Sequence, residues 1–157
     1  MGNFFKDLER AKPWEEKTLN LLINSTSGYK YENVADNPEY YYKGDIKITS
    51  LSTGVVKYLD VKLDNRIADT NNVLCEELVI CDSGKEYKGD MKKDYDYMAV
   101  VSPQKRQVYV LDCAIMKKNY KRGRYIQINH PTQFTIGYLN NLDTIKGWGA
   151  LLFTLCF

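Results

Sequence analysis

The chain is short of the residues from which zinc and redox sites are usually built. It contains one histidine, His130, and four cysteines, none of which forms a Cys-x-x-Cys pair. A structural zinc site, which takes four cysteine or histidine ligands, is therefore not expected. The N-terminus lacks a long apolar run, and the apolar tail at 148–157 is too short to span a membrane. We therefore expect a cytoplasmic protein with free thiols and no membrane partner.

The composition is that of an ordinary globular domain. The 157 residues are 44% hydrophobic and 27% charged, and the formal net charge is +2. That length predicts one domain over residues 1–157. A net charge so close to zero neither requires nor excludes a nucleic-acid partner, because the position of the charges decides binding. The thirteen tyrosines suit strands, interfaces and stacking on bases.

Apolar periodicity predicts one N-terminal helix followed mostly by strands. Helical spacing runs over residues 3–24, and Pro13 suggests a break just before it. The expected strands lie at 44–48, 55–63, 73–81, 95–101 and 107–115, and the last two form a hairpin. A further helical turn is expected near 139–145. This order fits an α/β domain with a central mixed β-sheet.

The most informative segment joins two of these strands. Asp45 opens the first strand, and Asp60-Val61-Lys62 ends the second. Side chains alternate along a strand, so Asp60 and Lys62 share one face while Leu59 points to the other. Charges on so apolar a strand are costly unless they are paired or functional.

Two carboxylates on neighbouring strands suit a divalent cation. Mg²⁺ (or Mn²⁺) prefers a few carboxylates and keeps several waters. Asp45, Asp60 and the carbonyl of Val61 would supply ligands, and Lys62 would orient the attacking water or offset negative charge. The alternative is a solvated Asp–Lys pair on a half-exposed strand, because other acid-x-lysine tripeptides occur in this chain and surface ion pairs are common.

The order of these motifs along the chain resembles that of the PD-(D/E)XK superfamily of nucleases. Asp45 is similar to the family's strand acid and Asp60-Val61-Lys62 to its (D/E)xK motif. The resembling segments further include the helix 13–23 with Glu15 and Glu16, the run Thr70-Asn71-Asn72 to Glu76, the later hairpin, and 135–139. The resemblance implies a restriction-endonuclease-like αβββαβ core of the small phage or bacterial type, and hence a bacterial cell or a phage-infected host.

The resemblance also implies a site and an activity. The activity would be metal-dependent endonucleolytic cleavage of DNA, structure-selective or junction-resolving, with a homodimer as one arrangement. The implied catalytic residues are Asp45, Asp60, Lys62 and Glu16, and the implied metal ligands are Asp45, Asp60, Val61, Glu16 and Glu76. Both Glu15 and Glu16 border the apolar stripe of the helix; we prefer Glu16, and an acid that only complements the helix dipole is the alternative.

A basic segment follows the hairpin and is a candidate nucleic-acid contact. Its members are Lys117, Lys118, Tyr120, Lys121, Arg122 and Arg124. Cations there would contact phosphates and the tyrosine would stack on bases, whereas the alternative is a solvated loop. The competing function for the whole chain is a non-catalytic binding module on the same fold, such as a phage protein that binds DNA or a host defence complex.

Overall fold

The computed structural model describes residues 2–157, with side chains from residue 10 onward. The helices are α1 (Gly2–Ser25), α2 (Ile67–Thr70), α3 (Cys113–Asn119) and α4 (Leu142–Gly147), with 3₁₀ turns η1 (Pro38–Tyr40), η2 (Asp90–Lys92) and η3 (Tyr120–Arg122). The strands are β1 (Tyr29–Asn33), β2 (Ile46–Ser50), β3 (Val56–Leu63), β4 (Asn72–Cys81), β5 (Glu86–Lys88), β6 (Tyr97–Ser102), β7 (Gln107–Asp112), β8 (Arg124–Asn129), β9 (Gln133–Asn141) and β10 (Leu151–Cys156). The predicted α/β class with a central mixed sheet is confirmed.

The central sheet has six strands in the order β1-β2-β3-β6-β7-β10. β3 and β6 run parallel, and every other pair in it is antiparallel. The segment between those two parallel strands leads into a second sheet, ordered β5-β4-β9-β8. The helical parts of this crossover are the short α2 and η2. The short apolar runs 73–75 and 78–81 form most of the strand β4 here, where the αβββαβ order expects a helix.

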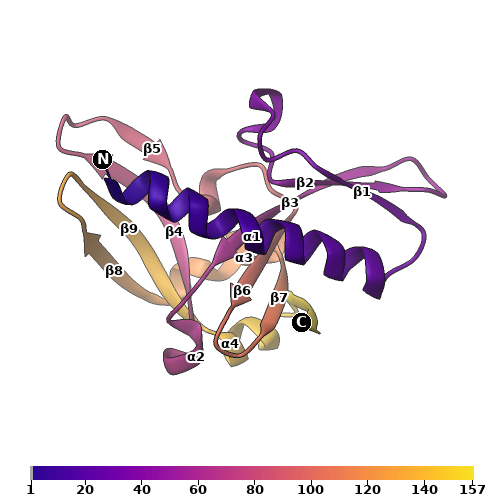
Figure 1. Ribbon diagram of the computed structural model, residues 1–157. Helices are drawn as coiled ribbons and strands as arrows, with labels where there is room; N and C mark the ends of the chain where they lie inside the picture. Colours follow the sequence, from indigo (N-terminus) through magenta and orange to yellow (C-terminus); the bar gives the residue numbers. More distant parts are fainter. Residues whose placement is uncertain (1) are drawn as a thin grey trace.

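Helix α1 covers one face of the six-stranded sheet (Figure 1). Leu22 packs there against Ile46 of β2, Leu59 of β3 and their neighbours in one buried cluster. The break expected before Pro13 is wrong, since α1 continues through it with Pro13 exposed. A proline inside a helix removes one backbone hydrogen bond, and packing of the apolar face against the sheet compensates for that loss.

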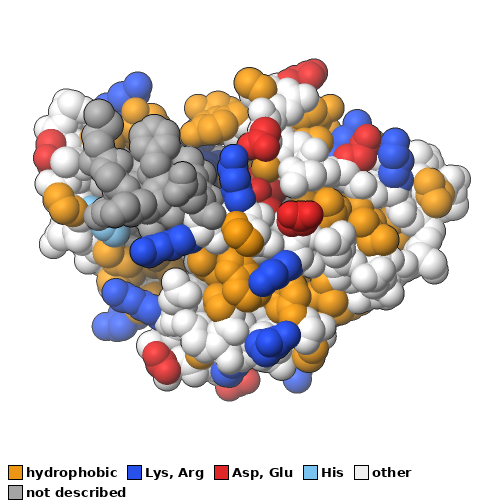
Figure 2. Space-filling model, in the orientation of Figure 1, with side chains coloured by type: hydrophobic (Ala, Val, Ile, Leu, Met, Phe, Trp, Pro, Cys, Tyr) orange, Lys and Arg blue, Asp and Glu red, His pale blue; other side chains and the backbone are white. Residues whose placement is uncertain are grey.

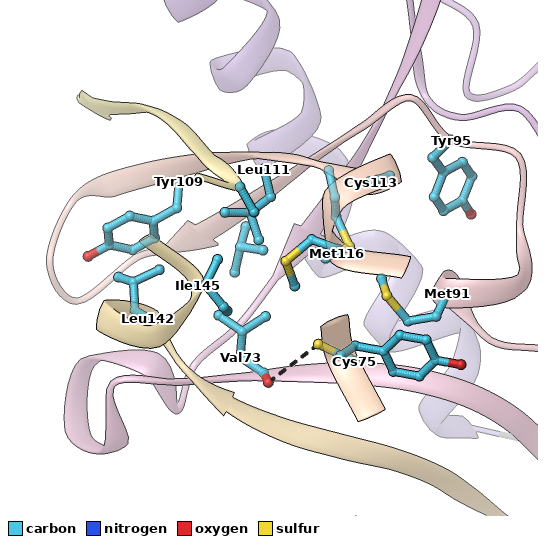
Figure 3. Close-up of a cluster of buried hydrophobic side chains, with 14 of the residues drawn as sticks. Val73, Cys75, Met91, Tyr95, Tyr109, Leu111, Cys113, Met116, Leu142 and Ile145 are labelled. Atoms are coloured by element: carbon cyan, nitrogen blue, oxygen red, sulfur yellow. Dashed lines mark hydrogen bonds between the residues drawn. The ribbon is translucent and has the colours of Figure 1, made fainter. Parts of the chain in front are cut away.

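The opposite face of the six-stranded sheet packs into a second core, which it shares with the other sheet (Figure 3). Leu111 of β7, Val73 and Cys75 of β4, Met116 of α3 and Ile145 of α4 meet there. Met98 and Val100 of β6 belong to the same cluster and stand in register with Asp60 and Lys62. The two charged residues of β3 therefore lie on the face that borders this core.

The apolar tail becomes the last strand of the sheet. β10 pairs with β7 in antiparallel fashion, with a register shift between Leu151 and Phe153. Leu152 and Phe153 stay 40% and 56% exposed. No helix in the described part of the chain is both long and apolar enough to cross a membrane.

Candidate acid–lysine site

Asp45 and Asp60 face each other across two antiparallel strands. The ladder between β2 and β3 ends at the pair Ile46 and Leu59, Asp45 and Asp60 are the next residues on the two strands, and their carboxyls lie within hydrogen-bond distance. The backbone N–H of Asp45 donates to the carbonyl of Leu59 at 2.9 Å, and its Oδ2 accepts from the N–H of Val61 at 2.8 Å. Gly44 permits this approach, because a Cβ there would stand 2.8 Å from the Leu59 oxygen at a φ of +137°.

The two carboxyls are electrostatically crowded. Burial raises the pKa of Asp60 well above its usual range, and the charges of Asp45 and Asp90 raise it further. Burial likewise raises the pKa of Asp45, although the Val61 N–H works against that rise. Lys93 is the cation that acts on both carboxyls, and its effect is smaller than that of burial. The pair therefore binds protons more tightly than two ordinary surface carboxylates would.

The helix acid that approaches Asp45 is Glu15. Burial, and then the charges of Asp45 and Asp36, raise the pKa of Glu15 to about 7. Glu16, which we preferred from the sequence, is exposed to solvent. Successive helix residues differ by about 100° in direction, so only one of two adjacent glutamates can border the buried stripe.

Lys62 is paired with other carboxylates. Its Nζ lies 2.5 Å from Oδ2 of Asp90 and 3.1 Å from Oε1 of Glu76, and the lysine side chain is 17% exposed. Burial disfavours the charge on both Asp90 and Lys62, but their mutual attraction lowers the pKa of Asp90 and raises that of Lys62. Glu76, expected as a metal ligand, is a partner of the lysine, and no sequence pattern singles out Asp90.

Two local features of the backbone bring Glu76 and Asp90 to the lysine. A register shift between Glu76 and Leu78 makes a β-bulge in β4 opposite β9. Gly89 packs against that bulge, since a Cβ on it would lie 2.5 Å from the Glu76 carbonyl oxygen. The N–H of Gly89 donates to the carbonyl of Glu77 at 2.9 Å, which places η2 and its Asp90 beside β4.

The basic segment is not a loop. It spans the last turn of α3, the turn η3 and the start of β8. Tyr120 is 3% exposed, its ring packs edge-on against Tyr138, and its hydroxyl donates to Glu77 at 2.9 Å. Its ring is therefore not available to stack on a base. Lys121 pairs with Glu77 at 3.0 Å, and Lys117 donates to the carbonyl of Lys93 at 2.5 Å.

Three cations of the segment remain at the surface and available to phosphates, namely Lys118, Arg122 and Arg124. A hollow of about 350 Å³ opens beside Tyr95, and its lining includes Lys57 and Lys117 together with the acids Asp94, Asp96 and Asp112. Tyr95 is 6% exposed, and burial followed by the charges of Asp60, Asp90 and Asp45 raises its pKa. The phenol therefore stands between this hollow and the carboxyls.

The donor chemistry of the Asp45–Asp60 pair suits a divalent cation, because a cation would relieve the repulsion between two enclosed carboxylates. Within the described residues, no three His, Cys, Asp or Glu side chains already stand in a metal-binding group. Comparison of the chain with protein-family models, with curated proteins and with solved structures found no match.

Proposed function

We propose that the protein is a metal-dependent endonuclease that hydrolyses phosphodiester bonds in DNA. The observation that carries this proposal is the opposed pair Asp45 and Asp60, whose pKa values are raised and which form no ion pair with a described lysine or arginine. Groups perturbed by burial and by like charge concentrate at functional sites. The order of motifs in the sequence, which resembles the PD-(D/E)XK superfamily, supports the same interpretation.

The residues divide into ligands and a fixed positive charge. Asp45, Asp60 and the Val61 carbonyl would hold Mg²⁺ or Mn²⁺, and Glu15 would contribute directly or through a water. When bound, such an ion lowers the pKa of a water and stabilises negative charge on the phosphate. The carboxyls must release their proton to bind the ion, so affinity should rise with pH.

Lys62 would act as a cation and not as a base. It stands two residues beyond Asp60 on the same face of β3, roughly 6 to 7 Å along the strand. Its raised pKa keeps it protonated, and Asp90 with Glu76 fixes the position of Nζ. A fixed positive charge beside the acid pair would stabilise charge that develops on the phosphate.

A metal titration with a matched pair of variants tests the proposal. Thermal unfolding is followed with Mg²⁺, Mn²⁺ or EDTA for the parent protein, Asp60→Asn, Glu15→Gln and Glu16→Gln. We expect metal to raise the Tm of the parent and of Glu16→Gln, to raise that of Glu15→Gln less, and to leave Asp60→Asn unchanged. Equal stabilisation of Asp60→Asn and the parent would refute the metal site.

Cleavage is measured with the same proteins and with Asp45→Asn. The substrates are supercoiled plasmid, single-stranded DNA, branched DNA and RNA, each with Mg²⁺ or Mn²⁺. Activity on any of them that Asp45→Asn and Asp60→Asn abolish supports the nuclease, and activity unchanged by both places the catalytic site elsewhere. Resolution of a DNA junction needs two cuts, which the two sites of a homodimer would supply. The oligomeric state is checked by mass measurement in solution.

One observation favours the alternative, a binding module without catalysis. The hollow beside Tyr95 does not include Asp45 or Asp60 among its lining residues. A substrate phosphate would therefore need the carboxyls to become more accessible than they are here. Nucleic-acid binding without metal stabilisation and without cleavage would decide for the binding module.

A further inference from the structure

A cluster of tyrosines and lysines adjoins the acid pair on the same face of the sheet. Tyr58 precedes Asp60 by two residues on β3, and strand alternation directs both to one face. Lys47 of β2 is the cross-strand partner of Tyr58, one pair away from the end of the ladder beside Asp45 and Asp60. The ring of Tyr40, on η1, packs against that of Tyr58 with centroids 5.8 Å apart. We call Tyr40, Tyr41, Tyr42, Lys43, Lys47 and Tyr58 the tyrosine–lysine surface.

The two lysines of this surface lie over aromatic rings. Nζ of Lys43 is 5.9 Å from the ring centroid of Tyr40 and 5.5 Å from that of Tyr58. Nζ of Lys47 is 5.8 Å from the Tyr40 centroid. These distances are within the range of cation–π attraction, which orients a charge without neutralising it. Among the described residues neither lysine makes an ion pair, so both charges are available to an anion.

Two further rings extend the surface into solvent. Tyr41 and Tyr42 are 68% and 58% exposed, with centroids 4.9 Å apart in an edge-to-face arrangement. They line a hollow of about 400 Å³ together with Pro38 and the residues before it. Figure 2 shows hydrophobic side chains at the top of the molecule, where Figure 1 places the turn between β1 and β2. Exposed neighbouring rings offer flat faces to a partner.

The backbone fixes this surface relative to the acid pair. The N–H groups of Lys43 and Gly44 both donate to the carbonyl of Tyr40, which closes the turn. The N–H of Asp45 then bonds to β3, so the turn ends at the first carboxylate. Of the acids on the turn, Asp36 is paired with Lys12 at 3.5 Å, while Glu39 is exposed.

We propose that the tyrosine–lysine surface binds single-stranded nucleic acid and leads it to Asp45 and Asp60. This inference rests on the proposed function and narrows its substrate class. Lys43 and Lys47 take backbone phosphates, and Tyr41 and Tyr42 stack on bases. Stacking on protruding rings requires bases whose faces are free, as in a single strand or a flap, whereas a duplex keeps those faces inside its own stack.

Binding is measured in EDTA, so that no metal-dependent cleavage interferes. The probes are fluorescein-labelled oligothymidine, its duplex with oligoadenine, and oligouridine, followed by fluorescence anisotropy. The variants are Tyr41→Ala/Tyr42→Ala and Lys43→Ala/Lys47→Ala. The matched control is Lys85→Ala/Tyr87→Ala, which removes an exposed tyrosine and the lysine 5.1 Å from its ring centroid on the other sheet.

We expect single strands to bind more tightly than the duplex. Each stacking ring removed should weaken single-strand binding about tenfold, since stacking contributes roughly 1–3 kcal/mol per base. The lysine variant should lower the slope of log affinity against log salt by about 0.7 for each phosphate that the protein no longer neutralises. Comparison of oligothymidine with oligouridine assigns the surface to DNA, to RNA or to both.

Three outcomes of the binding assay overturn the inference: equal affinity for duplex and single strand, no binding by the parent protein, or losses in the Lys85/Tyr87 control as large as those in the tyrosine variant. The proposed function fails separately. Tyrosine-dependent binding without cleavage would support the binding surface and refute the nuclease function. Cleavage unchanged in both surface variants would support the nuclease function and refute the role of this surface.

Discussion

Replacement of Lys62 by methionine removes the cation that Asp90 and Glu76 share. The three side chains are 17%, 9% and 27% exposed, and the distances from Nζ to the two carboxylates measure 2.5 and 3.1 Å. Removing one partner of a buried ion pair costs about 3–5 kcal/mol, because the other charge stays behind without compensation. A typical domain has only about 5–15 kcal/mol of stability, so this loss would be a large part of the total.

A double-mutant cycle separates the pair from the site around it. Asp90→Asn removes a charge that burial disfavours and leaves Lys62 with Glu76, so it should cost less than Lys62→Met. The double variant removes both charges, and we expect its loss in free energy of unfolding to be about 2 kcal/mol smaller than the sum of the two single losses. Urea unfolding is followed by the fluorescence of Trp14 and Trp148 and by circular dichroism.

The result that would refute this reasoning is a Lys62→Met variant within about 0.5 kcal/mol of the parent, or a double variant with additive losses. The expected cost also affects the catalytic test. Loss of cleavage in Lys62→Ala would reflect catalysis only if the folded fraction is measured in the same sample. Asp60→Asn, which removes a charge from a crowded pair, is the cleaner variant.

Three further variants test the packing and charge around the site. The pKa of Glu15 is raised from 4.5 to about 7, so between these pH values the folded protein binds more protons than the unfolded chain. The free energy of unfolding should therefore fall as the pH rises through this range. In urea titrations across the range, Glu15→Gln should remove about 1 kcal/mol of that fall, after allowance for solvent screening. Thr18 is fully buried and its Oγ1 has no partner among the described residues, so Thr18→Val should raise the free energy of unfolding by about 1 kcal/mol. Gly89→Ala should lower it by about 2 kcal/mol through the clash with Glu76, whereas Gly147→Ala, which meets nothing within 4 Å, should not.

The parts of the site that depend on local periodicity could be predicted from the sequence. Alternation along 55–63 directs Asp60 and Lys62 to one face and Leu59 to the other, and the structure has that arrangement. The predicted hairpin is present in β6 and β7. It ends earlier than expected because Asp112 accepts from the N–H of Ile115 and begins α3.

The parts that depend on distant segments could not be predicted. Asp90 is 28 residues from Lys62, and it reaches the lysine because Gly89 packs on a bulge in β4. The choice between Glu15 and Glu16 depends on the rotation of α1 against the sheet, which no repeat in the helix specifies. Tyr120 lies in a segment whose charge suggested a surface loop, and its burial follows from packing against β9.

Two groups of carboxylates border the same face of β3, and they differ in whether a described side chain forms an ion pair with them. Asp90 and Glu76 have Lys62, and the pKa of Asp90 is lowered despite burial. Asp45 and Asp60 have no such partner among the described residues, and the pKa of each is raised. A structural role accounts for the first group, because its charges are compensated within the fold. In the second group the Val61 N–H donates to Asp45 but no ion pair compensates either charge, so a cation taken from solvent, as proposed above, would stabilise the ionised pair.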